Sequence, residues 1–178
     1  MTDIEDTNNS NANILCKACG LCCTGYLFIW AKLRPSELDS AEALGLQVFR
    51  SDPSHRRFSQ PCPLWQGQCT IYATPHYPHV CRAYKCKLLK ELLNDETSLP
   101  NALTVIGQIK EKISELELLL PISSSKNFRE RVVAQIEALQ QSARQEQADI
   151  EFSLKAKALL TIYDKVFEVR DFLDPSDN

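Results

Sequence analysis

Hydrophobic residues recur every three or four positions over much of the chain after residue 87, which is the spacing of one face of an α-helix. The clearest stripe predicts an amphipathic helix over 101–120, ending before Pro121. Its members are Leu103, Ile106, Ile109, Ile113, Leu116 and Leu120. The same spacing predicts a short helix near 88–93 and longer helices over 126–143 and 150–173. We therefore expect an antiparallel helical hairpin or small bundle over residues 88–178.

The chain before residue 88 has no such stripe, and it holds most of the prolines, which interrupt helices and central strands. Residues 14–87 are therefore predicted to be loop-rich, with one helix at 35–44 between Pro35 and Gly45. The apolar run from Tyr26 to Trp30 is consistent with a buried strand or with the start of a helix. Residues 1–13 are polar and are predicted to be a disordered tail.

Charge is distributed unevenly along the chain, whose net charge is -3. Residues 14–87 carry nine basic and four acidic side chains, whereas the rest carries 11 basic and 19 acidic ones. A basic region can indicate nucleic-acid binding, but no interleaved aromatic pattern accompanies it, so we do not expect a nucleic-acid partner. Basic side chains also stabilise metal-bound thiolates, and we prefer that interpretation.

All eight cysteines lie in this basic region. They are Cys16, Cys19, Cys22, Cys23, Cys62, Cys69, Cys81 and Cys86. The N-terminus lacks the basic and apolar regions of a secretory signal, and no apolar run is long enough to span a membrane. We therefore expect a cytoplasmic protein, in which thiols stay reduced and serve as metal ligands rather than as disulfides.

The strongest motif is the C-x2-C-x2-C-C run from Cys16 to Cys23. Thiolates at this spacing can converge on one centre, and Gly20 allows the backbone to bend around it. Three cysteines from one loop suit an iron–sulfur centre, with Cys62, which precedes a proline, as a candidate fourth ligand. Zinc is the alternative, because it takes four thiolate or imidazole ligands. All eight cysteines are candidate metal ligands, and one of Cys22 and Cys23 could serve a second centre or be a buried free thiol.

Four sequence elements in this order resemble a known family. They are Cys16-x2-Cys19-Gly20-x-Cys22-Cys23, Cys62-Pro63-Leu64, Cys69-x-Ile71-Tyr72 and Pro78-x2-Cys81-Arg82-x-Tyr84-x-Cys86. Together they resemble the bacterial CxxCxxCC proteins, the YkgJ-type cysteine cluster family. The resemblance implies chelation of zinc or iron by these cysteines. It says nothing about the helical region.

These observations predict a mainly α protein with a loop-rich, metal-stapled cysteine cluster domain over 14–87 and a helical region after it. The predicted function is binding of zinc or an iron–sulfur cluster, with the ion holding the N-terminal half together. An electron-transfer protein is one alternative. An enzyme such as a protein methylase is another, because a flagellin lysine methylase has a similar cluster, but no glycine-rich cofactor loop supports it. A protein partner could bind the helical region.

Overall fold

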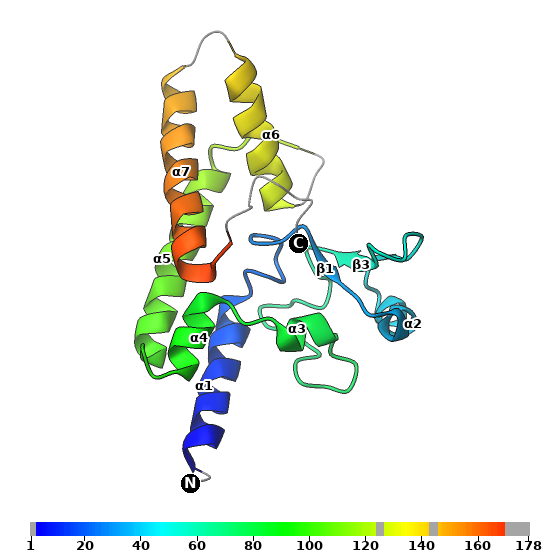
Figure 1. Cartoon of the computed structure of the whole chain (residues 1–178). Helices are drawn as coiled ribbons and strands as arrows, with labels where there is room; N and C mark the ends of the chain where they lie inside the picture. Colours follow the sequence, from blue (N-terminus) through cyan, green and yellow to red (C-terminus); the bar gives the residue numbers. More distant parts are fainter. Residues whose placement is uncertain (1–2, 124–126, 143–145, 170–178) are drawn as a thin grey trace.

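The computed structural model describes residues 3–123, 127–142 and 146–169 (Figure 1). Its elements are α1 (Asp3–Cys19), β1 (Trp30–Lys32), the 3-10 helix η1 (Pro35–Glu37), α2 (Leu38–Ala43), β2 (Val48–Phe49), β3 (Arg57–Ser59), α3 (His79–Ala83), α4 (Lys87–Leu93), α5 (Leu99–Glu117), α6 (Phe128–Gln141) and α7 (Gln147–Phe167). This confirms a mainly α chain with a loop-rich front portion. The outer ends of the predicted tail and helices, at 1–2, 126, 143 and 170–173, lie outside the described residues.

Four helices form a column with the larger of two hydrophobic cores inside it. Helix α5 packs antiparallel against α7, while α1 and α4 pack against the lower half of the pair (Figure 1). The buried face of α5 is made by Ala102, Ile106, Ile109, Ile113 and Leu116, and the last four belong to the predicted stripe. Leu120 is also buried but lies after the end of the helix, and Leu103 is half-buried. Helix α6 packs on α7. The predicted hairpin or small bundle is thus confirmed, and no helix in the described ranges is long and apolar enough to cross a membrane.

A smaller lobe lies beside the column and contains an antiparallel sheet in the order β1-β3-β2. Phe58, at the centre of β3, is opposite Ala31 of β1 and Val48 of β2. It is buried in a second core that also contains Leu33, Leu38, Ala41 and Leu46. The apolar run from Tyr26 to Trp30 was compatible with a strand or a helix. Only its last residue, Trp30, lies in a strand.

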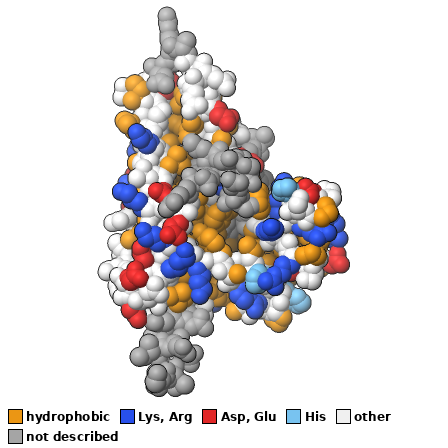
Figure 2. All heavy atoms as spheres, viewed as in Figure 1, with side chains coloured by type: hydrophobic (Ala, Val, Ile, Leu, Met, Phe, Trp, Pro, Cys, Tyr) orange, Lys and Arg blue, Asp and Glu red, His pale blue; other side chains and the backbone are white. Residues whose placement is uncertain are grey.

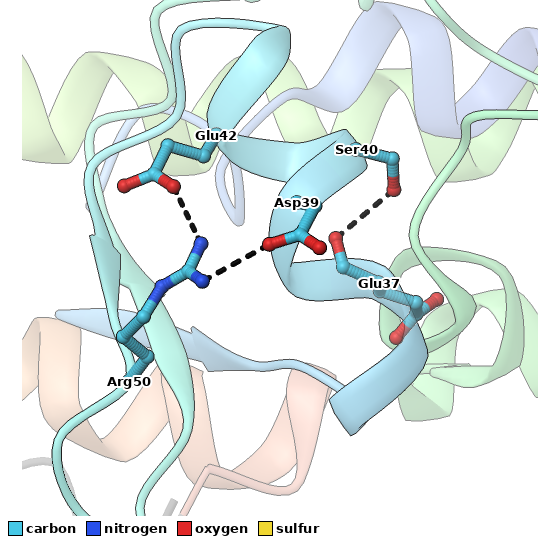
Figure 3. Close-up of polar contacts among 5 residues, drawn as sticks. All are labelled: Glu37, Asp39, Ser40, Glu42 and Arg50. Carbon is cyan, nitrogen blue, oxygen red and sulfur yellow. Dashed lines mark hydrogen bonds and ion pairs between the residues drawn. The ribbon is translucent and has the colours of Figure 1, made fainter.

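The predicted helix at 35–44 is present as η1 followed by α2, and it ends at Gly45, which has φ +83°. Figure 3 shows how Arg50, just after β2, holds α2: its guanidinium donates to Asp39 at 3.0 Å and also to Glu42. Ser40 donates to the Glu37 carbonyl at 3.0 Å. These ion pairs are exposed, so each contributes at most about 1 kcal/mol. The stability of the smaller lobe depends more on its small apolar core than on these ion pairs.

The N-terminal segment differs from the sequence prediction. The chain from Asp3 is helical and belongs to α1, where a disordered tail was expected over 1–13. Local composition missed this because the helix is held by tertiary contacts: Ala12 and Leu15 are buried in the larger core. Asn13 also accepts a hydrogen bond from the Tyr72 hydroxyl at 2.7 Å.

Helix α6 is joined to the loops of the front portion by two buried polar side chains. Asn127 caps the helix by accepting from the Glu130 N–H at 3.2 Å, and its amide donates to the carbonyls of Phe28 and Gln60, each at 3.3 Å. Arg129 is fully buried and donates to the Leu27 carbonyl at 3.4 Å. Residues on both sides of position 87 therefore share one packed structure, and the division there stays a prediction.

Replacing Asn127 should destabilise the protein strongly. Asn127→Ala removes a helix cap and leaves the Phe28 and Gln60 carbonyls without this donor, so we expect a loss of about 2–3 kcal/mol in the free energy of unfolding. Chemical denaturation measures this value. Asn101→Ala, at an exposed position of α5, is the control and should change it by no more than about 0.5 kcal/mol. Equal effects of the two substitutions would contradict this role for Asn127.

Candidate metal centre

The eight cysteines come from five places in the fold and are all partly buried free thiols. Cys16 and Cys19 lie in the last turns of α1, and Cys22 and Cys23 lie in the turn that follows. Cys62 and Cys69 belong to the loop after β3. Cys81 lies in α3, and Cys86 immediately precedes α4 as its N-cap residue.

A cavity of about 270 Å³ lies where these segments meet, and seven of the eight cysteines line it, Cys62 being the exception. The rest of the wall is mostly apolar or aromatic. It includes Leu15, Leu21, Leu27, Phe28, Trp30, Trp65, Tyr72, Tyr77, Tyr84, Leu88, Leu89, Ile106 and Phe167. Figure 2 shows apolar side chains gathered between the helical column and the smaller lobe, with Lys and Arg side chains over that lobe. The sulfurs therefore face a poorly hydrated space.

Two backbone features bring the cysteine segments together. The N–H of Cys62 donates to the carbonyl of Cys23 at 2.7 Å, which joins the loop after β3 to the turn after α1. Gly20 has φ +67°, and a Cβ there would lie 2.0 Å from the Trp65 ring. Trp65 thus packs directly on the backbone of the C-x2-C-x2-C-C turn. Glycine is required at position 20 for this contact as well as for the bend that the sequence indicated.

Helix α3, which carries Cys81, is positioned by Glu37 of η1. The Glu37 carboxylate accepts from the Arg34 N–H at 2.8 Å and from the His79 N–H, at the start of α3, at 2.6 Å. In the middle of the helix, the Cys81 carbonyl accepts from the Tyr77 hydroxyl at 3.1 Å. A carboxylate paired with the first N–H of a helix is a favourable placement. Glu37 was not identified from the sequence, since no local signal links positions 37 and 79.

Burial shifts every thiol of the set toward its protonated form. It raises the pKa of Cys16 to about 12, with further contributions from Cys86 and Cys19. It raises the pKa of Cys19 to about 11 and that of Cys81 to about 12. The cause is that a thiolate loses hydration in an apolar cavity and is repelled by neighbouring thiolates. A bound cation reverses both effects, because it stabilises thiolates directly.

Lysines near individual thiols provide some positive charge. Lys110 of α5 donates to the Ala18 carbonyl at 2.7 Å and lowers the pKa of Cys19, against the larger effect of burial. Lys17 acts in the same direction on the pKa of Cys69, and Lys90 on that of Cys86, again against the larger effect of burial. These charges are fewer than the thiols, so they do not replace a metal ion.

The donor set suits zinc or an iron–sulfur centre, both of which take thiolate ligands. Among the residues that the structure describes, no three Cys, His, Asp or Glu side chains are already arranged to hold an ion. Binding therefore requires the thiols to turn toward a common point within the cavity. His76 and His79, the histidines nearest in sequence to Cys81, are exposed. Arg82, which follows Cys81, donates to the Thr74 carbonyl at 3.3 Å.

A helical protein with this many thiols around one cavity belongs to the class of cysteine-rich chelating proteins. Residues 15–102, just under half of the chain, match the model of the CxxCxxCC family, described as "Putative zinc- or iron-chelating domain". The match includes all eight cysteines and ends within α5. No curated protein and no solved structure matches the chain. The family resemblance is thus confirmed, while its bacterial YkgJ-type branch stays a prediction.

The contact between Gly20 and Trp65 gives a second test of the structure. Gly20→Ala places a Cβ inside the indole ring and forces alanine to adopt a positive φ, so we expect a loss of more than about 2 kcal/mol in unfolding free energy. Gly67→Ala is the matched control, because Gly67 also has a positive φ of +76° but has no atom within 4 Å of the added Cβ. It should cost only about 1–2 kcal/mol. Denaturation curves that put Gly20→Ala at or below the cost of the control would contradict the packing of Trp65.

Proposed function

We propose that this chain is a metal-binding protein whose cysteines chelate zinc or an iron–sulfur cluster, and that the bound ion holds the N-terminal half together. The observation that carries the proposal is the meeting of cysteines from separate segments around one largely apolar cavity. The family match supports metal chelation in general. Free thiols in every cysteine position support a reducing compartment, and we place the protein in the cytoplasm.

The smaller lobe needs such an ion because its own core is small. Five buried side chains form that core, and two of its strands have three residues while the third has two. Lobes of this size are marginally stable without disulfides or metals. A structural thiolate-bound ion contributes on the order of 10 kcal/mol in small metal-dependent domains. An ion bound by Cys62, Cys69 or Cys81 would therefore decide whether the lobe is folded.

Electron transfer is the second candidate function, and the C-x2-C-x2-C run favours it. Three cysteines at that spacing on one turn are typical of iron–sulfur ligation. The wall of apolar and aromatic side chains would limit solvent access to such a cluster, which affects its reduction potential.

Metal analysis of the purified protein tests the proposal. Full-length protein purified without oxygen should contain stoichiometric zinc, or iron together with acid-labile sulfide and visible absorption. Chelation of the metal under reducing conditions should melt the front portion while leaving helical signal from α5 and α7, as measured by circular dichroism. A reduced, metal-free protein with an unchanged melting temperature would overturn the proposal. A colourless protein that contains zinc would support the metal-binding proposal and exclude electron transfer through the metal.

Metal affinity should increase with pH. The pKa values of Cys16, Cys19 and Cys81 are raised to about 11–12, so these thiols are protonated at neutral pH and must release protons on binding. Each proton released tightens the apparent dissociation constant by up to about tenfold per pH unit. Competition of the protein with a chromophoric chelator for Co²⁺ between pH 6 and 8 measures the slope. An affinity that does not change with pH would exclude coordination by these thiols.

A further inference from the structure

We propose that the eight cysteines form two separate four-thiolate centres, with the neighbours Cys22 and Cys23 assigned to different ones. The helix-side group consists of Cys16, Cys19, Cys22 and Cys86. The sheet-side group consists of Cys23, Cys62, Cys69 and Cys81. This inference rests on the proposed metal binding and adds the number of centres and the ligands of each.

Packing separates six of the eight cysteines into two sets. All four members of the helix-side group pack against the larger core, inside the helical column. Cys62 and Cys81 pack against the second core, under the sheet. The two cores are distinct clusters of buried side chains, so thiols anchored on different cores are held by different parts of the fold.

The backbone places the helix-side group together. Cys16 and Cys19 lie in the last turns of α1, and α1 packs along α4. Cys86 is the N-cap residue of α4, so this packing brings it to the end of α1 that carries the thiols. Cys22 follows within one turn. The sequence offered Cys62 as a fourth partner of the C-x2-C-x2-C run, and that stays a prediction. Cys86 shares the larger core with Cys16, Cys19 and Cys22, whereas Cys62 packs against the second core.

The sheet-side group is joined by a different set of hydrogen bonds. The Cys62 N–H donates to the Cys23 carbonyl at 2.7 Å, and the Trp65 N–H donates to the Cys62 carbonyl at 3.1 Å. Trp65 in turn forms an antiparallel bridge with Cys69, which folds the 62–69 loop back on itself. Cys81 enters from α3, next to Cys62 on the second core.

The chemistry of the donors fits this number. Four thiolates complete the tetrahedron of Zn²⁺, and four thiolates also bind one iron–sulfur cube. The helix-side group has three cysteines at two-residue intervals and one remote cysteine, as iron–sulfur sites often do. The sheet-side group takes its ligands from three segments at wide spacing. The two centres can therefore differ in the ion they bind.

Substitution at the two adjacent positions tests the division. The reduced, full-length protein and its Cys22→Ser and Cys23→Ser variants are loaded with Co²⁺, and the bound ions are counted by native mass spectrometry. We expect two ions in the unaltered protein and one in each variant. Alkylation followed by peptide mapping should then label Cys16, Cys19 and Cys86 in Cys22→Ser. In Cys23→Ser it should label Cys62, Cys69 and Cys81.

A second pair of variants, Cys86→Ser and Cys62→Ser, removes one ligand from each group away from the shared turn. Cys86→Ser should release Cys16, Cys19 and Cys22 for labelling, and Cys62→Ser should release Cys23, Cys69 and Cys81. One ion in the unaltered protein, the same labelled thiols in both members of a pair, or loss of all ions in every variant would overturn the two-centre inference while leaving metal binding intact. An unaltered protein that binds no Co²⁺ would instead overturn the proposed function itself.

Discussion

The constraint on which this structure depends is the cost of burying sulfur charge. Eight thiols lie partly buried, seven of them around an apolar cavity, and burial raises the pKa of every one. A protonated thiol is a weak ligand and a weak hydrogen-bond donor, so the arrangement has little purpose without a cation. Packing of Trp65 on Gly20 and the bond from Cys62 to Cys23 position the thiols at this cavity, where a cation would stabilise them as thiolates.

The helical column is part of this site rather than a separate module beside it. Leu88, Leu89, Ile106 and Phe167 line the cavity from α4, α5 and α7. Ile106 and Phe167 lie beyond the end of the family match, so this chain uses additional sequence to close one wall. Asn127 and Arg129 hold the start of α6 against the same loops. Binding or loss of a metal at the site would therefore also affect the helices that cover it.

Sequence reasoning predicted the helices well and the placement of the sulfurs less well. The buried stripe of α5 follows from the local spacing of apolar residues, and the end of α2 just before Gly45 follows from the backbone preference of glycine. Each signal lies within a single segment of the sequence. The helix at 3–13 was missed because its support comes from α4, α5 and Tyr72, far away in sequence. The fourth partner of the C-x2-C-x2-C run stays a prediction, because Cys62 and Cys86 are both remote from the run in sequence. Binding of a protein partner to the helical region stays a prediction.

The tryptophans have a consequence for how the protein can be studied. The chain has two, Trp30 and Trp65, and both are in the wall of the cavity. Indole emission depends on the polarity around the ring and is quenched by nearby thiolates and by many transition-metal centres. The molecule therefore contains an intrinsic optical reporter beside its sulfurs, and loading could be followed in real time without attaching a dye.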